Sequence, residues 1–146
     1  MSVSTATAIE VIDALGMRAH PEGGWYVETW RAAAPPGGGR PSGSAILYLL
    51  ARGERSHWHA VDAAEIWQWS AGEPLELSVW VEGGAVVIHR LGGRVTDGEV
   101  AQVVVPAGAW QAARPLGDWA LAGCIVTPAF EFDGFRLAPE GWEPPA

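Results

Sequence analysis

The chain has 146 residues, of which 49% are hydrophobic and 18% are charged. This length and composition exclude intrinsic disorder and predict one compact domain over residues 1–146. The 17 acidic residues exceed the 9 basic ones, and the resulting net charge of −8 predicts that the chain has no nucleic-acid partner. Every basic residue is an arginine, which excludes Schiff-base chemistry on a lysine side chain. Tryptophan is abundant, with 9 residues.

The sequence lacks the marks of export and of membrane insertion. Its first residues contain no basic segment followed by a long apolar one, and no apolar run approaches the roughly 20 residues that cross a bilayer. We therefore expect a cytoplasmic protein without a membrane partner. The sole cysteine, Cys124, lies in an apolar run, so no disulfide can form within the chain and a buried thiol is expected.

The N-terminal part predicts a helix, a strand and a loop. Apolar residues from Ala8 to Leu15 recur at helical spacing, so a short amphipathic helix is expected over about residues 4–16, with Ser4 as its N-cap. The aromatic and β-branched run over residues 24–30 predicts a strand. Residues 32–43 are rich in alanine, proline and glycine, which predicts a mobile loop.

From residue 44 onward, apolar or alternating runs recur about every ten residues and are separated by turn signals. No helical period intervenes, so we expect an all-β barrel over about residues 44–138 rather than alternating strands and helices. After the turn at Pro106–Gly108, a further strand is expected to carry Trp110 and Gln111. The other expected strands are Ala45–Ala51, Ser56–Val61, Ala64–Ala71, Leu75–Glu82, Ala85–Leu91, Val100–Val105, Trp119–Thr127 and Phe130–Leu137.

The densest polar group in this apolar region is formed by His57, His59 and Glu65. Residues two apart on a strand share a face, so both histidines are expected to point the same way, with Glu65 opposite them on the next strand. Two imidazoles and a carboxylate would suit a divalent metal. Histidines of an aromatic strand are also often hydrogen-bonded wall residues, and the spacing alone leaves both interpretations open.

Other side chains are candidates for ligand binding. Arg31 has the planar fork that binds a carboxylate or a phosphate, although pairing with a neighbouring acid would explain it equally well. Gln111 follows a tight turn and could bond to a ligand or belong to the barrel wall. Indoles beside Glu65 would favour a raised pKa of its carboxyl group. Trp67 and Trp69 share a face with Glu65, whereas Trp58 and Trp110 are further candidates for aromatic contacts with a ligand.

These residues resemble the two sequence motifs of the cupin superfamily. The residues that match are Gly53, His57, His59, Glu65 and Gly72 in the first motif and Pro106, Gly108 and Gln111 in the second. The resemblance is closest to the DUF985 (Cupin_5) family, whose recurring blocks cover nearly the whole chain. The blocks are His20–Trp25, Thr29–Arg31, Gly43–Leu50, Ser56–Val61, Glu65–Trp69, Gly72–Leu77, Val105–Gln111 and Thr127–Phe132.

The resemblance implies a cupin double-stranded β-helix, or jelly roll, with a short N-terminal helix, a pocket in the barrel mouth and assembly as a homodimer. Cupins in general hold one divalent metal with two or three histidines and a glutamate. This chain departs from that set: Gln111 stands where the second motif supplies a histidine, Gln68 where relatives often carry one, and the position of His57 varies within the family. We therefore favour no bound metal. If a divalent metal is bound, the expected ligands are His57, His59 and Glu65.

The first functional hypothesis is an enzyme resembling the epimerases and isomerases among metal-free cupins. It would act by proton transfer on a small polar metabolite, sugar-like or carboxylated. His59 would be the general base, Glu65 would orient it, and Tyr48 would donate a proton. Arg31 would hold an anionic group of the substrate.

Two further hypotheses stay open at this stage. One is a non-catalytic module that captures a sugar or another small metabolite on flat aromatic faces. Its aromatic contacts would come from Trp58, Trp67, Trp69 and Trp110, and Gln111 could add a hydrogen bond. The other is a metal-dependent oxygenase that uses the possible metal ligands named above.

Overall fold

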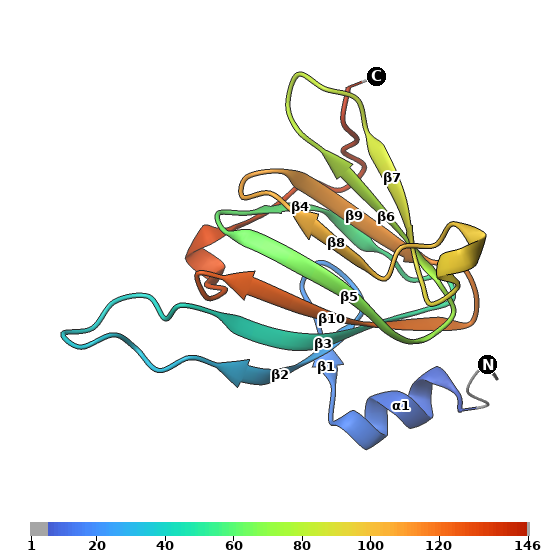
Figure 1. Cartoon of the computed structure of the whole chain (residues 1–146), viewed down its shortest axis with the longest axis horizontal. Coiled ribbons are helices and arrows are strands. Elements are labelled where there is room, and N and C mark those ends of the chain that lie inside the picture. The colour runs from blue at the N-terminus through green and yellow to red at the C-terminus, as the bar shows by residue number, and fades with distance from the viewer. Residues whose placement is uncertain (1–5, 146) are drawn as a thin grey trace.

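The computed structural model describes residues 6–145 as two facing antiparallel β-sheets and one α-helix (Figure 1). The larger sheet consists, in spatial order, of β1 (Arg18–Ala19), β2 (Trp25–Arg31), β3 (Ser44–Ala51), β10 (Trp119–Thr127), β5 (Ala64–Gly72) and β8 (Gln102–Val105). The smaller sheet consists of β11 (Phe135–Leu137), β4 (Ser56–Val61), β9 (Trp110–Pro115), β6 (Leu75–Trp80) and β7 (Val87–Leu91). The predicted all-β architecture is thereby confirmed.

Helix α1 (Ala8–Leu15) begins at a capping box, in which Thr7 and Glu10 satisfy each other's backbone N–H groups. It ends at Gly16, which adopts a left-handed conformation. The N-cap is therefore Thr7, whereas Ser4, the expected cap, lies outside the described residues. The helix packs on the outer face of the larger sheet, where Leu49 and Trp119 are buried beneath it.

The expected strands over 56–61 and 119–127 match the observed ones, and the others differ at one or both ends, most of them by one or two residues. β7 starts at Val87, after a turn that extends past Gly84. The prediction of one strand over residues 130–137 is wrong, because residues 132–134 form a 3-10 turn and β11 starts at Phe135. Gly134 in this turn lies so close to Asp62 that a Cβ atom would overlap its carboxylate.

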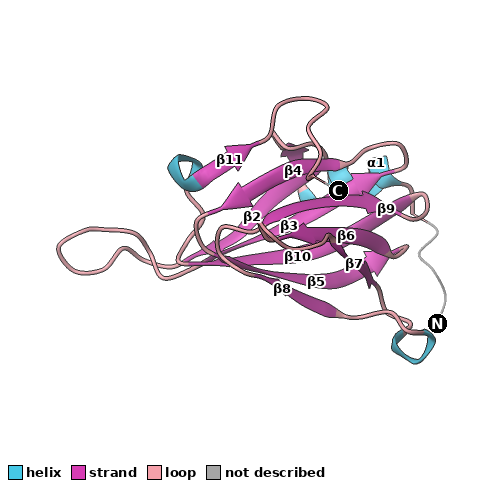
Figure 2. Ribbon diagram, turned by 90° about the horizontal axis from the view of Figure 1, so that it is seen from above, coloured by secondary structure: helices cyan, strands magenta, loops and turns pink. Residues whose placement is uncertain are grey.

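The main core lies between the two sheets, whose arrangement is seen in Figure 2. Tyr48, Trp67 and Cys124 of the larger sheet meet Leu75 and Leu77 of the smaller sheet there, all nearly inaccessible to solvent. Alternation along each strand points these side chains inward. Within residues 6–145 no helix is long and apolar enough to cross a membrane.

A second apolar cluster lies on the outer face of the smaller sheet. Trp58, Trp80 and Trp110 project outward from their strands, and the C-terminal segment folds back so that Trp142 packs against all three. The guanidinium of Arg136 lies 5.2 Å from the ring centre of Trp110. Much of the tryptophan excess therefore serves packing outside the barrel.

Candidate functional site

The two histidines of the His57–His59 pair point to opposite sides of β4. Ser56 pairs with Ala113 and His59 with Gln111, so three steps along β4 correspond to two along β9, and the strand holds an extra residue. His59 turns into the barrel and is 1% exposed. His57 turns outward, where its Nε2 lies 2.9 Å from the carbonyl oxygen of Pro139. The expectation that both share one face is wrong, because the bulge breaks the alternation.

Glu65 and Gln111 meet inside the barrel. The Gln111 amide donates to Glu65 Oε1 at 2.8 Å and accepts from the indole N–H of Trp67 at 2.7 Å, so both ends of the amide are used. The Cys124 thiol lies near enough to the Glu65 carboxyl group for the two groups to shift each other's pKa. Gln111 therefore holds the carboxyl group of Glu65 in place.

A second buried carboxyl group, Glu22, reaches the same interior from the turn between β1 and β2. Its Oε2 accepts a hydrogen bond from the Ser56 hydroxyl. Its Oε1 lies 3.4 Å from His20 Nδ1 and 3.5 Å from His59 Nε2. The next two residues are glycines with positive φ, and a Cβ atom on Gly24 would lie 2.7 Å from the carbonyl oxygen of Leu49. This close backbone approach carries Glu22 into the barrel.

Burial governs the protonation of these groups. It raises the pKa of Glu22 to about 8, although hydrogen bonds to that carboxyl group act in the opposite direction. It raises the pKa of Glu65 to about 7, although the charge of His59 lowers it. It lowers the pKa of His20 to about 4 and also lowers the pKa of His59 below its usual value. Near neutral pH the histidines are therefore uncharged and Glu22 carries its proton.

The hydrogen bonds also define the tautomers of the two imidazoles. His59 Nδ1 lies 2.8 Å from the His57 carbonyl oxygen, which cannot donate, so Nδ1 carries the hydrogen and Nε2 is free to accept one from Glu22. The backbone N–H of Glu22 donates to His20 Nδ1, which makes that atom an acceptor. His59 Nε2 is thus a base with a proton donor beside it.

Tyr48 lies inside the barrel, but its hydroxyl group donates to the carbonyl oxygen of Gly23. Burial, followed by the nearby Glu22 charge, raises its pKa well above the usual value. The Tyr48 hydroxyl thus holds the turn that carries Glu22.

Four predicted ligand contacts lie away from the His59 and Glu65 side chains. Arg31 is exposed on β2 and binds the Glu28 carboxylate and the Phe130 carbonyl oxygen. Trp58 and Trp110 belong to the outer cluster, since each is next to an inward-facing residue and alternation turns it outward. Trp69, four residues beyond Glu65, packs against the main core. Its indole N–H donates a hydrogen bond to the Glu73 carbonyl oxygen.

Sequence reasoning missed Glu22, His20 and Ser56 as a group. The sequence signal was present in the order His20-Pro21-Glu22-Gly23-Gly24, because consecutive glycines permit a backbone path close to another strand. Reading the pattern strand by strand could not show that this turn enters the barrel beside β4, where the His57 N–H donates to the Glu22 carbonyl oxygen.

Phenylalanines cover the site at the end of the barrel. The Phe135 ring lies 5.5 Å from that of His59 and 6.1 Å from that of His20, and Phe130 stacks against Phe135. Arg40, in the irregular stretch 32–43, holds the segment that carries these phenylalanines in place. Its guanidinium binds both carboxylate oxygens of Asp62 and the Ala129 carbonyl oxygen.

The profile of the Cupin_5 family, described as Cupin superfamily (DUF985), matches residues 9–138. The chain belongs to this family. Two solved structures resemble this cupin over most of both chains. A Shewanella oneidensis protein is 33% identical, with a TM-score of 0.87 over 92% of this chain and 85% of its own. A hypothetical protein from Leishmania major is 28% identical, with a TM-score of 0.83 over 91% and 88%.

Oxalate decarboxylase from Bacillus subtilis shares the fold of this cupin. Its structure at pH 4.6 is 16% identical, with a TM-score of 0.64 over 82% of this chain and 29% of its own. No protein with a curated description matches the sequence. The fold is therefore that of a cupin, while the chemistry depends on the residues in the barrel.

The donor set of this cupin does not fit the metal site that its superfamily implies. His57 points out of the barrel, and both ends of the Gln111 amide are used by Trp67 and Glu65. Among residues 6–145, no three histidine, cysteine, aspartate or glutamate side chains come together as metal ligands. Of the three ligands expected from the sequence, only His59 and Glu65 face the interior, which is fewer than the three protein ligands of a typical catalytic site.

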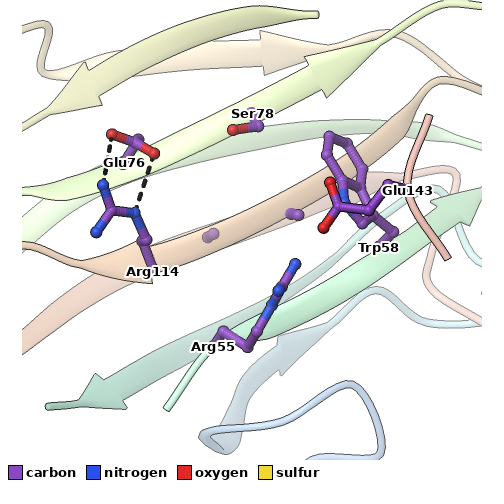
Figure 3. A pocket seen from close by; sticks show the side chains of 8 residues that line it. Arg55, Trp58, Glu76, Ser78, Arg114 and Glu143 are labelled. Carbon is purple, nitrogen blue, oxygen red and sulfur yellow. Dashed lines mark hydrogen bonds and ion pairs between the residues drawn. The ribbon is translucent and has the colours of Figure 1, made fainter. Parts of the chain in front are cut away.

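The outer face of the smaller sheet carries a shallow hollow of about 240 Å³ (Figure 3). Arg55 extends into it beside Trp58, above a floor that includes Ser78. Arg114 at its rim is bound to Glu76 through two hydrogen bonds. The hollow lies on the opposite side of the sheet from Glu22 and His59, so it is separate from the site in the barrel.

Proposed function

We propose that this cupin transfers protons on a small polar metabolite inside the barrel, as an isomerase or epimerase does. The supporting observation is the approach of His59 Nε2 to Glu22 Oε1 at 3.5 Å, in an interior that also contains Glu65. A neutral imidazole beside a neutral carboxylic acid is a matched base and acid near pH 7. This pairing replaces the sequence-based assignment of Tyr48 as proton donor.

The proposed reaction is a proton shift next to a carbonyl group. His59 Nε2 removes a proton from the carbon beside the carbonyl, while Glu22 gives its proton to the carbonyl oxygen, so a C–H bond breaks and an O–H bond forms. When that carbon also carries a hydroxyl group, the intermediate is an enediol, whose second hydroxyl group can return a proton to Glu22. Return of a proton to the neighbouring carbon, or to the other face of the same carbon, gives the isomer or epimer and restores both groups without any change of oxidation state.

Glu65 and Tyr48 are proposed to be positioning residues. The ionised form of Glu65 would stabilise the positive charge that develops on His59 when it accepts the proton. The charge of Glu65 raises the pKa of His59, and the charge of His59 lowers the pKa of Glu65. Gln111 holds the Glu65 carboxyl group, and Tyr48 holds the turn before Glu22.

The test is solvent-proton exchange at carbon. The full chain is incubated in D₂O with a panel of aldoses, ketoses and hydroxy-aldehydes, and deuterium incorporation is followed by NMR. We expect His59→Asn and Glu22→Gln to abolish the exchange seen with the unmodified chain, and His57→Asn, which changes the outward histidine, to retain it. Exchange that survives in His59→Asn, or an absence of exchange across the whole panel, would contradict the proposal.

The alternative hypotheses have less support in the site. Trp58 and Trp110 lie outside the barrel, so an aromatic sugar-binding pocket would lack two of its expected walls. The metal-dependent oxygenase would need three ligands that come together around one ion, and no such group is found among residues 6–145. The homodimer and the cytoplasmic location stay proposals drawn from the family resemblance and from the sequence.

A further inference from the structure

The barrel interior of residues 6–145 contains acids but no permanent cation. The sequence has no lysine, and its arginines are all exposed except for the half-buried Arg40. The Arg40 guanidinium is bound to Asp62 and the Ala129 carbonyl oxygen at the barrel end, 2.7–3.1 Å from these acceptors. Two carboxyl groups, Glu22 and Glu65, face the interior without a guanidinium partner.

The interior histidines do not replace the missing cation. His20 and His59 have side chains that are 5% and 2% exposed, and burial lowers the pKa of each. Both are therefore uncharged near pH 7. Ionisation of Glu65 or Glu22 adds negative charge, so the interior is either neutral or negative across the neutral range.

A ligand's charge decides whether it can be desolvated in such an interior. Moving an anion from water into a low-dielectric space is strongly unfavourable unless a cation compensates its charge. Here the neighbouring groups would add repulsion, and the net charge of −8 would oppose its approach. A neutral polar molecule meets no such penalty, and an amine would be stabilised by a carboxylate.

We infer that the ligand held in the barrel carries no negative charge, and is an uncharged or cationic polar molecule rather than a carboxylate or phosphate. The inference rests on the proposed function only for the position of the site. It narrows the substrate class, because the carboxylated metabolites considered from the sequence required a cationic anchor, and Arg31 is bound on the surface instead.

The Cys124 thiol offers a probe of the interior, because it is 2% exposed and lies near enough to the Glu65 carboxyl group to shift its pKa. Iodoacetamide and iodoacetate are alkylating agents of nearly equal size that differ by one negative charge. For each reagent, the rate of Cys124 alkylation in the full chain at pH 7.5 is divided by the rate of the same reagent with glutathione. The two ratios are then compared. We expect iodoacetate to be disfavoured by a factor of about ten, the effect of one nearby like charge.

Two variants separate the interior charge from the charge of the whole chain. Glu65→Gln is expected to raise the relative iodoacetate rate several-fold. Glu82→Gln removes the same charge from an exposed turn and should leave it unchanged. Equal relative rates for both reagents would overturn the inference, as would alkylation that occurs only through global unfolding. Neither outcome depends on turnover, so failure here is distinguishable from failure of the deuterium-exchange test.

Discussion

Glu22 is the residue whose chemistry depends most on its surroundings. Two glycines with positive φ bring it into the barrel, Ser56 donates to one carboxyl oxygen and two imidazoles face the other. The same burial that raises its pKa to about 8 also couples its protonation to folding. The folded state keeps a proton that the unfolded chain loses near pH 4.5.

The free energy of unfolding is therefore expected to fall as the pH rises. The contribution of Glu22 is fully present below about pH 4.5 and is lost towards pH 8, and that of Glu65 is lost towards pH 7. His20 acts below pH 6.5, where its lowered pKa reduces stability as the pH falls. From pH 6.5 to 8 we expect a decline on the order of 1 kcal/mol per pH unit in urea unfolding.

Glu22→Gln tests the source of that decline. The amide cannot ionise, so the variant should lose less stability than the unmodified chain between pH 6.5 and 8, whatever its absolute stability. A slope identical to that of the unmodified chain would mean that Glu22 ionises normally when folded.

Gly24→Ala addresses the backbone path directly. A Cβ atom there would lie 2.7 Å from the Leu49 carbonyl oxygen and 2.8 Å from the Tyr48 hydroxyl oxygen, at a φ of 74°. We expect a loss of more than about 2 kcal/mol in urea unfolding. Gly38→Ala also has positive φ but meets no neighbouring atom, so its smaller loss would measure the conformational strain alone.

For individual residues, the sequence predicted part of the site in the barrel. His59, Glu65 and Gln111 could be placed in the interior because they recur in motifs whose strand positions are regular. Glu22 could not, because its place depends on a turn that packs against β4 from far away in the sequence.

At the scale of elements, β4 determines what the barrel contains. Period-two alternation predicted its boundaries correctly but placed His57 on the wrong side, since a bulge is invisible in a hydrophobic pattern. The same strand separates two environments: Ser56 and His59 face the polar interior, and Trp58 faces the outer tryptophan cluster.

The C-terminal segment stabilises that outer face. Trp142 stacks on Trp110 with ring centres 4.9 Å apart and also contacts Trp58 and Trp80. Trp142→Ala should lower the free energy of unfolding by about 2 kcal/mol, because it leaves the other indoles uncovered. Trp30→Ala, at an indole that is 52% exposed, is the matched control and should cost less than half as much. Equal losses would show that Trp142 contributes no more than a surface tryptophan.

At the scale of the whole molecule, the two sheets enclose the site and the segment 128–137 covers its end (Figures 1 and 2). Strand order and the covering segment both depend on contacts between distant parts of the chain. The pattern of apolar runs predicted an all-β barrel, whereas the contact between Arg40 and Asp62, 22 residues apart, required the structure.

Arg40→Ala should make the interior more accessible. Loss of its bonds to Asp62 and the Ala129 carbonyl oxygen frees the segment that carries Phe130 and Phe135. We expect alkylation of Cys124 by iodoacetamide to accelerate about tenfold while the urea midpoint changes little. Arg52→Ala removes an exposed pair with Asp118 and should have no effect on the rate. An unchanged rate in Arg40→Ala would mean that reagents enter by another route.

The Arg40 contacts also affect how long a bound molecule stays in the barrel, independently of how tightly it binds. A molecule enclosed behind Phe130 and Phe135 has to wait for the same opening to leave as to enter. The contacts of a single guanidinium would then set the residence time of the product, and release instead of bond breaking would limit turnover in the proposed reaction.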